Sequence, residues 1–190
     1  MKPVDKKKSI LDAVEKLGKT KRFHEIKLDK VANMAKVGKG TIYLYFSDKN
    51  DLFQQVALNG ISEMCDTVET DVKSDLSFES KLTAVSTKIS DFFISRNSLM
   101  NLLREYEAQA GLPDKCTCSH ERKRLFNYLL QVLQQGVEEN KVRKDIDLAV
   151  QAVFLLGVLR TRDHAFQRHG IPIPPIETAI DIYLNGITIK

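Results

Sequence analysis

The spacing of apolar residues constrains this chain most, because nearly every apolar segment repeats at the three-to-four-residue interval of an α-helix. The first such face consists of Ile10, Leu11, Val14 and Leu17. Strand-like alternation, internal repeats and low-complexity tracts are absent from the sequence. The pattern predicts an all-α fold of about nine helices.

Loop and capping residues set the expected ends of these helices. Asp48 is a good N-cap for the fourth helix, Asp51 can act as in a capping box, and Asn140 suits a left-handed helix end. After the first helix we expect helices over Leu28–Ala35, Gly38–Tyr45, Asp51–Val72, Phe78–Ile94, Leu99–Ala108, Ser119–Glu139, Leu148–His169 and Ile176–Ile187. We place a small domain in residues 1–50 and a larger one in residues 51–190, joined by the fourth helix.

The positive charge of the chain is concentrated at its N-terminal end. Residues 1–50 hold 13 Lys and Arg against 6 Asp and Glu, whereas the remaining residues hold 16 against 19. Such a basic module is typical of a protein that meets a polyanion, although a solvated basic surface is the alternative. No apolar run of about 18 residues predicts a membrane span, and the N-terminus does not resemble a signal peptide. We therefore expect a cytoplasmic protein.

The stretch VGKGTIYLYFSDKNDLF, residues 37–53, contains a GKGT sequence that invites two interpretations. A nucleotide-binding loop needs the pattern G-x-x-x-x-G-K-[ST] after a strand. Here Asn33 occupies the first glycine position, Gly40 follows Lys39, and the preceding segment is helical. These departures exclude a nucleotide loop as the leading interpretation.

The same stretch fits the second half of a helix-turn-helix, in which the second helix enters the DNA major groove. Leu28–Ala35 would be the first helix, residues 36–37 the turn and Gly38–Tyr45 the recognition helix. The two glycines in this short helix cost roughly 1 kcal/mol each by propensity, which is reasonable where a partner must approach closely. We expect inward anchors at Val37, Ile42 and Phe46, and outward side chains at Lys39, Thr41, Tyr43 and Leu44.

The motif V-G-K-G-T-I-Y-L-Y-F-x-x-K-x-x-L-F resembles the TetR family of bacterial transcription regulators over about residues 8–58. The resemblance implies a homodimer with two DNA-binding heads and a C-terminal ligand-binding domain. It also implies that Lys49, at the start of the fourth helix, holds a DNA phosphate. The residues that it places at recognition-helix positions are Gly38, Lys39, Gly40, Thr41, Tyr43, Leu44 and Tyr45.

Four positions depart from the family pattern. Lys27 replaces a Ser or Thr that commonly caps the second helix, which exchanges a neutral cap for a cation that can still meet DNA. The turn reads Ala35-Lys36-Val37-Gly38 where the family usually has A-G-V-S, so a hydroxyl is lost. Leu44 can contact a thymine methyl but cannot make a two-pronged base contact. Lys39 and Thr41 remain the best base-reading candidates, while Lys6, Lys7 and Lys8 would meet phosphates.

The C-terminal half suggests a dimer and a ligand pocket. The segment 148–159 is apolar nearly all round, so it needs burial on two sides. In the family the last two helices form an intersubunit bundle, and we expect a homodimer through about residues 148–187, with a buried monomer helix as the alternative. A mainly apolar ligand pocket could include polar anchors at Arg104, Glu105 or Glu107. Its candidate lining residues, each of which could instead be core, are Phe92, Phe93, Met100, Leu103, Tyr106, Phe126, Leu130 and Phe154.

No constellation in the sequence indicates catalysis or a cofactor. Cys116, Cys118 and His120 supply at most three ligands where a structural zinc site needs four. Loop cysteines are therefore the simpler interpretation, with a thiol or metal sensor as the alternative. The histidines form no readable catalytic set with Ser or Cys, and the segment 160–164 is expected to be solvated or at a dimer rim. We expect neither an enzyme nor a bound metal.

These features predict a DNA-binding transcriptional regulator, a repressor that binds a palindromic double-stranded operator as a homodimer. A small apolar or amphipathic effector would release it. The alternative is a DNA-associated structural or cell-cycle protein that uses the same head without an inducer.

Overall fold

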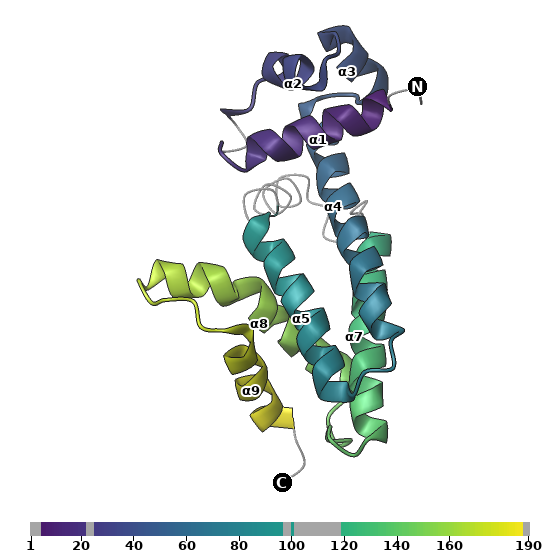
Figure 1. The fold of residues 1–190 in the computed structure, drawn as a ribbon, viewed down its shortest axis with the longest axis vertical. Coiled ribbons are helices and arrows are strands. Elements are labelled where there is room, and N and C mark those ends of the chain that lie inside the picture. The colour runs from purple at the N-terminus through teal and green to yellow at the C-terminus, as the bar shows by residue number, and fades with distance from the viewer. Residues whose placement is uncertain (1–4, 22–24, 97–99, 101–118, 188–190) are drawn as a thin grey trace. The chain divides into compact units, whose positions relative to one another are not determined.

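The computed structural model describes residues 5–21, 25–96, 100 and 119–187, and this part of the chain contains eight α-helices and no strand (Figure 1). The all-α prediction is confirmed. The predicted helix Leu99–Ala108 lies, apart from Met100, outside the described residues. The helices are α1 (Lys6–Gly18), α2 (Leu28–Ala35), α3 (Lys39–Tyr45), α4 (Lys49–Val72), α5 (Phe78–Ser95), α7 (Ser119–Glu138), α8 (Leu148–Arg168) and α9 (Ile176–Ile187).

Contacts within the chain group it into two compact units, and α4 contributes residues to both. The first unit comprises Met1–Ile61 with Ser95–Ser119, and the second comprises Ser62–Ile94 with His120–Lys190. The domain limits expected from the sequence, 1–50 and 51–190, stay a prediction. No helix among the described residues is long and apolar enough to cross a membrane.

The first unit, which we call the head, has a continuous apolar core built from α1, α2, α3 and the start of α4. Ile42 on α3 and Phe46 just after it are each only 1% exposed. Val37, in the turn before α3, packs against the same core. Burying each large side chain contributes about 1.5–3 kcal/mol, so Ile42 and Phe46 fix α3 firmly on the head. The predicted inward anchors of this helix are confirmed.

The turn between α2 and α3 is closed by two backbone hydrogen bonds. Lys36 adopts a left-handed conformation, with φ 56° and ψ 42°. Its N–H donates to the carbonyl of Asn33 at 3.3 Å, and the N–H of Val37 donates to the carbonyl of Ala32 at 3.0 Å. This pair of bonds is the Schellman arrangement that usually has glycine at the left-handed position. The left-handed conformation at Lys36 therefore turns the chain from α2 into α3, at a position where glycine would be the favoured residue.

The start of α4 is capped as the sequence indicates, with one difference. The Asp48 carboxylate accepts the N–H of Asp51 at 2.8 Å, as an N-cap does. The Asp51 carboxylate reaches back to the N–H of Ser47 at 2.8 Å, one residue earlier than in a standard capping box. Hydrogen bonds from Gln55 and from the Ser47 N–H lower the pKa of Asp51. The helix consequently begins at Lys49, two residues before the predicted start.

The second unit, which we call the helical unit, has a core of aliphatic side chains from α4, α5, α7 and α8. Leu82, Ile89 and Leu129 are fully buried. At one end, the N–H of Phe78 donates to the Glu139 carboxylate at 3.2 Å, which ties the start of α5 to the end of α7. Asn140 has a φ of 56°, so the predicted left-handed end of α7 is confirmed.

Candidate functional site

The outward face of α3 is the most unusual surface of the head. Tyr43, Leu44 and Tyr45 are 52%, 82% and 41% exposed, although α3 has only seven residues. Water alone gives no reason to gather three large apolar side chains on so short a helix, and such patches mark interaction sites. Thr41 lies half-buried beside them. Lys39, Tyr43 and Leu44 are exposed, as predicted, whereas their contacts with DNA bases stay a prediction.

The two glycines at the start of α3 are not required by the packing of the head. A Cβ on Gly38 would meet only Thr41 Oγ1, at 3.8 Å, and a Cβ on Gly40 would meet nothing within 4 Å. Neither glycine has the positive φ that would demand this residue type. Gly38 is the extended N-cap of α3, a position that suits glycine, whereas Gly40 lies inside the helix and its cost in helix propensity is not explained by the chain itself. Close approach of a partner to the start of α3 stays a prediction for Gly40.

Lys39 forms an ion pair that the sequence analysis missed. Its Nζ lies 2.9 Å from Asp29 Oδ1, and the two side chains are 51% and 66% exposed. The hydrogen bond with Asp29 and its negative charge raise the pKa of Lys39. The pair joins the first turn of α2 to the first turn of α3. The expected base-reading lysine is thus held by a carboxylate on the same surface.

Two further lysines of the head are positioned by aromatic rings. Lys49 Nζ lies 5.4 Å from the centre of the Phe53 ring, and Lys7 Nζ lies 5.9 Å from that of Phe46. Partial burial lowers the pKa of Lys49. Because the two rings belong to the core, both ammonium groups are directed at fixed points of the surface. Lys27 precedes α2 as an exposed cap residue without a side-chain capping bond, as expected from the loss of Ser or Thr.

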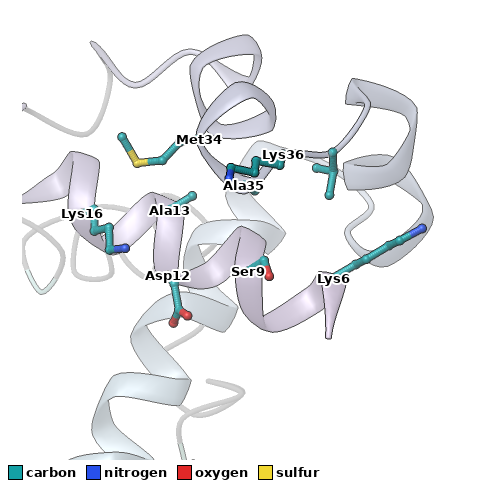
Figure 2. Close-up of a pocket in the computed structure, with 9 residues that line it drawn as sticks. Lys6, Ser9, Asp12, Ala13, Lys16, Met34, Ala35 and Lys36 are labelled. Carbon is teal, nitrogen blue, oxygen red and sulfur yellow. The ribbon is translucent and has the colours of Figure 1, made fainter. Parts of the chain in front are cut away.

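An open cleft of about 400 Å³ lies on the head between α1 and the end of α2. Figure 2 shows Ala13 and Met34 between lysines that extend from both elements. Three lysines against one aspartate give this cleft a positive balance, which adds to the basic character of the head. Its lining residues are Lys6, Ser9, Asp12, Ala13, Lys16, Met34, Ala35, Lys36 and Val37.

The eight predicted ligand-contacting residues are not gathered into one described pocket. Phe92 is buried and its ring lies 5.6 Å from that of Phe93. Phe154 is 68% exposed on the outer side of α8, which corrects its expected place in the interior. Met100 is buried but groups with the head, while Phe126 and Leu130 are half-buried on α7. Leu103 and Tyr106 lie outside the described residues, as do Arg104, Glu105 and Glu107.

A second open hollow, of about 640 Å³, lies between α7 and the start of α8. Leu130 is the only predicted ligand-contacting residue among those that line it, and most of the others are polar or charged. The hollow therefore does not have the apolar lining expected for the effector. Its lining residues are Leu130, Gln131, Gln134, Gln135, Glu138, Asp147, Leu148 and Ala149.

Arg162 lies partly inside the helical unit, although its segment was expected to be solvated or at a dimer rim. Its Nη1 donates to Ser90 Oγ at 2.9 Å, and its Nη2 donates to the carbonyl of Pro174. Its Nε is buried without an acceptor. Ser86, one helical turn before Ser90, is fully buried and its hydroxyl also has no partner. Sequence periodicity indicated the burial of this face of α5 but not the arginine that meets it.

Exposed apolar side chains lie along one side of α8, and a further one lies on α9; we call them together the apolar stripe. The spacing of its α8 members is that of a single helix face. Their exposed fractions range from 38% to 68%, and Ile182 on α9 is 70% exposed. The stripe agrees with the expectation that this segment needs burial on two sides. Its members are Val150, Val153, Phe154, Val158 and Ile182.

The described residues give no support to a thiol or metal sensor. Burial raises the pKa of Cys65 to about 12, so its thiol is neutral and unreactive at physiological pH. His120 Nδ1 lies 3.3 Å from Glu121 Oε1 at the surface. No cluster of three metal-ligating side chains occurs in the part of the chain that the structure describes. Cys116 and Cys118 lie outside it.

Comparison with known proteins agrees with this geometry. Residues 10–56 match the family model for bacterial regulatory proteins of the tetR family. The fatty acid metabolism regulator protein of Bacillus subtilis is 23% identical over 150 residues, covering 79% of this chain and 77% of the relative. An uncharacterized helix-turn-helix regulator of Haemophilus influenzae is 28% identical over 112 residues, covering 59% of this chain and 60% of the relative.

Solved structures share the fold over nearly the whole chain. FadR from Bacillus subtilis, in complex with stearoyl-CoA, has a TM-score of 0.72 at 19% identity and covers 95% of this chain and 98% of its own. FadR from Bacillus halodurans has a TM-score of 0.74 at 18% identity and covers 96% and 95%. The relatives named here are transcriptional regulators and not enzymes, which agrees with the expected lack of catalysis. The match over residues 10–56 identifies the head of this chain as one of the tetR family of bacterial regulatory proteins.

Proposed function

We propose that this protein is a cytoplasmic transcriptional repressor that binds a palindromic operator as a homodimer and releases it when a long-chain acyl compound binds. The observation that carries the proposal is the outward face of α3, with three large apolar side chains and a held lysine exposed on a basic, TetR-family head. Surfaces of this kind need a partner, and a polyanion with base edges and methyl groups suits both the lysines and the apolar side chains.

The contacts with DNA divide into positioning and reading. Lys27 and Lys49 lie at the starts of α2 and α4, where they would hold backbone phosphates. Lys39 and Thr41 would meet base edges from the first turn of α3, and Leu44 would meet a thymine methyl. Together with Lys6, Lys7 and Lys8, which are also expected to meet phosphates, the phosphate contacts outnumber the base contacts, so affinity should fall steeply with salt concentration.

The apolar stripe on α8 and α9 is the proposed dimer surface. A two-fold axis through it would bring each stripe against its own copy, which is the self-complementary arrangement of most protein dimers. Two heads related by that axis would read two half-sites of one palindrome. Because the same axis would relate the two heads, a change in the helical unit at this dimer surface would change the spacing between them.

The effector class follows from the apolar interior together with the relatives. One relative is named as a fatty acid metabolism regulator, and a solved neighbour is a complex with stearoyl-CoA. The helical unit here offers buried aromatic and aliphatic side chains, of which Phe92 is one. A long acyl chain suits such surroundings. Binding would release DNA if the ligand prefers a head spacing that the operator does not fit.

The test begins with selection of an operator from a random duplex library and measurement of its affinity by fluorescence anisotropy. We expect Lys39→Ala with Thr41→Ala to reduce preference for the selected sequence, and Lys49→Ala to weaken all sequences alike. Stearate or stearoyl-CoA should weaken binding of the selected duplex. Failure to enrich any sequence would contradict operator binding. Enrichment without a response to either acyl compound would favour a DNA-associated protein that has no such effector.

The dimer is tested separately by light scattering. We expect Val153→Glu to yield monomers, because it places a charge at the centre of the stripe, and to weaken operator binding. Glu substitution of exposed Asn127 on α7 gives a matched surface control. A wild-type protein that is monomeric at micromolar concentration would contradict the proposed dimer.

A further inference from the structure

We propose that Arg162, with Ser86 and Ser90, binds the carboxylate of a long-chain fatty acid inside the helical unit. The inference rests on the proposed acyl effector and deepens it, because it names the head group and the residues that hold it. A free fatty acid carries a carboxylate at the end of its chain, whereas a coenzyme A thioester has a neutral carbonyl at that place. The two ligands therefore place different demands on a buried cation.

Arg162 has only neutral hydrogen-bond partners among the described residues. Its guanidinium donates to the Ser90 hydroxyl and the Pro174 carbonyl, both of them neutral, and its Nε has no acceptor. A partly buried cation normally has an anionic partner, because removal of its hydration must be offset. Among the described residues, no carboxylate contacts Arg162.

Two other partly buried arginines show how this chain treats such a group. Arg124 pairs with Asp66 at 2.7 Å, and also with Glu69 and Glu121. Arg96 pairs with Glu15 at 3.2 Å. Arg162 differs from both, which singles it out as a cation whose counter-ion is not supplied by the described chain.

Two buried serines lie on α5, and one of them, Ser90, bonds to Arg162. Ser86 and Ser90 are four residues apart, so they lie on one face of α5, and they are 0% and 1% exposed. Their neighbours Val85 and Ile89 are fully buried. A buried hydroxyl without a partner has an uncompensated cost, because its hydrogen bonds to water are lost and not replaced, and Ser86 has no partner. Alanine would fill this place without that cost, so the hydroxyl is better explained by a ligand oxygen.

The geometry of the guanidinium defines how an acid would bind. Nε and Nη2 form one edge on which a carboxylate can accept two parallel hydrogen bonds. Nη1 can keep its hydrogen bond to Ser90 when the acid binds. The carboxylate would, however, compete with the Pro174 carbonyl for the hydrogen bond from Nη2. The acyl chain would then run along the apolar side chains of α5, where Phe92 and Phe93 follow the serines.

The Pro174 contact gives this site a route to the proposed dimer surface. Pro174 lies in the segment between α8 and α9, and α8 and α9 carry the apolar stripe. A carboxylate that displaces its carbonyl would release one of the bonds that holds this segment against α8. Ligand binding and the position of α9 are thereby coupled through a single donor.

The experiment measures displacement of Nile red, a neutral apolar dye, from the full-length protein by stearate, octadecanol and stearoyl-CoA. Octadecanol has the same chain length as stearate but no charge. In the wild type we expect stearate to displace the dye at about ten- to a hundredfold lower concentration than octadecanol, as a charge-assisted two-pronged bond implies. Arg162→Gln should remove this difference, and Arg162→Lys should restore part of it. Ser86→Ala should weaken stearate alone by severalfold.

Arg143→Gln is the matched control, because it removes a guanidinium that already pairs with Asp145 at the surface. It should leave all three ligands unchanged. Equal weakening of stearate and octadecanol by Arg162→Gln would mean that Arg162 only supports the fold, and would overturn the proposal. Displacement by stearoyl-CoA but not by stearate would overturn it while leaving the acyl effector intact. Displacement by none of the three would remove the acyl effector itself.

Discussion

Replacement of Lys36 by glycine should stabilise the protein. Lys36 holds the left-handed conformation at the end of α2, with φ 56° and ψ 42°. A residue with a Cβ is disfavoured there by roughly 1–2 kcal/mol. Glycine removes that strain but loses about 0.5–1 kcal/mol through its greater freedom in the unfolded chain. The net gain is therefore about 0.75 kcal/mol, within a range of about 0–1.5 kcal/mol, and the central value corresponds to roughly 1.5–3 °C in Tm for a two-state chain of this length.

A second substitution separates backbone strain from charge. Lys36 lines the same basic cleft as Lys6 and Lys16, so its removal could also relieve repulsion between ammonium groups (Figure 2). Lys36→Ala removes the charge but keeps a Cβ at the strained position. If strain is the cause, Lys36→Gly gains stability and Lys36→Ala does not.

Urea unfolding followed by circular dichroism at 222 nm, roughly the helical minimum, measures both variants, since the described chain is entirely helical in its regular structure. The midpoint for Lys36→Gly should exceed that of Lys36→Ala at an unchanged slope. Equal midpoints for the two variants would refute the strain argument and leave charge as the explanation. A urea midpoint for Lys36→Gly below that of the wild type would refute both the strain and the charge explanation.

Two further outcomes follow from the charged groups. Asp29→Asn should free Lys39 for phosphates, so affinity for a shuffled duplex should rise about threefold or more and discrimination for the operator should fall. Anisotropy titrations at matched salt test this, and an equal gain from Asp12→Asn, on α1, would contradict it. Hydrogen bonds, the strongest of them from Lys73, lower the pKa of Glu69 from 4.5 to about 2. The stabilisation is present above about pH 4.5 and is lost as pH falls toward about 2. The difference in urea midpoint between the wild type and Glu69→Gln should therefore shrink over that range, and a constant difference would exclude this linkage.

The helix boundaries could be read from the sequence where a local signal marks them. The range of α2 is as predicted, and α9 likewise runs from Ile176 to Ile187, after the prolines that precede it. Asp48 caps α4 because a short acceptor side chain directly before a helix can accept a free N–H of its first turn. These are properties of neighbours in sequence, so the sequence alone carries them.

Contacts between separate helices were not predictable in the same way. Asp29 and Lys39 meet only because the α2–α3 turn brings two first turns together, and periodicity says nothing about that angle. Arg162 was expected to be solvated or at a dimer rim because it lies in a charged run that follows an apolar segment. Its burial depends on Ser90 of α5 and Pro174, which are 72 and 12 residues away in sequence. Long side chains near helix ends are therefore the places where sequence reasoning fails first.

The surface that the head would present to DNA, as proposed above, offers few means of telling one sequence from another. Leu44 and Tyr43 contribute mainly apolar contact, and the position before Lys39 is a glycine without a hydroxyl. Lys39 is the one charged donor of the outward α3 face among the described residues, and Asp29 restrains it to one side. A restrained lysine can favour one base edge, whereas a free one would accept any phosphate within reach. Specificity in this protein should therefore depend on the Asp29–Lys39 pair and on the spacing of two heads, more than on the number of base contacts.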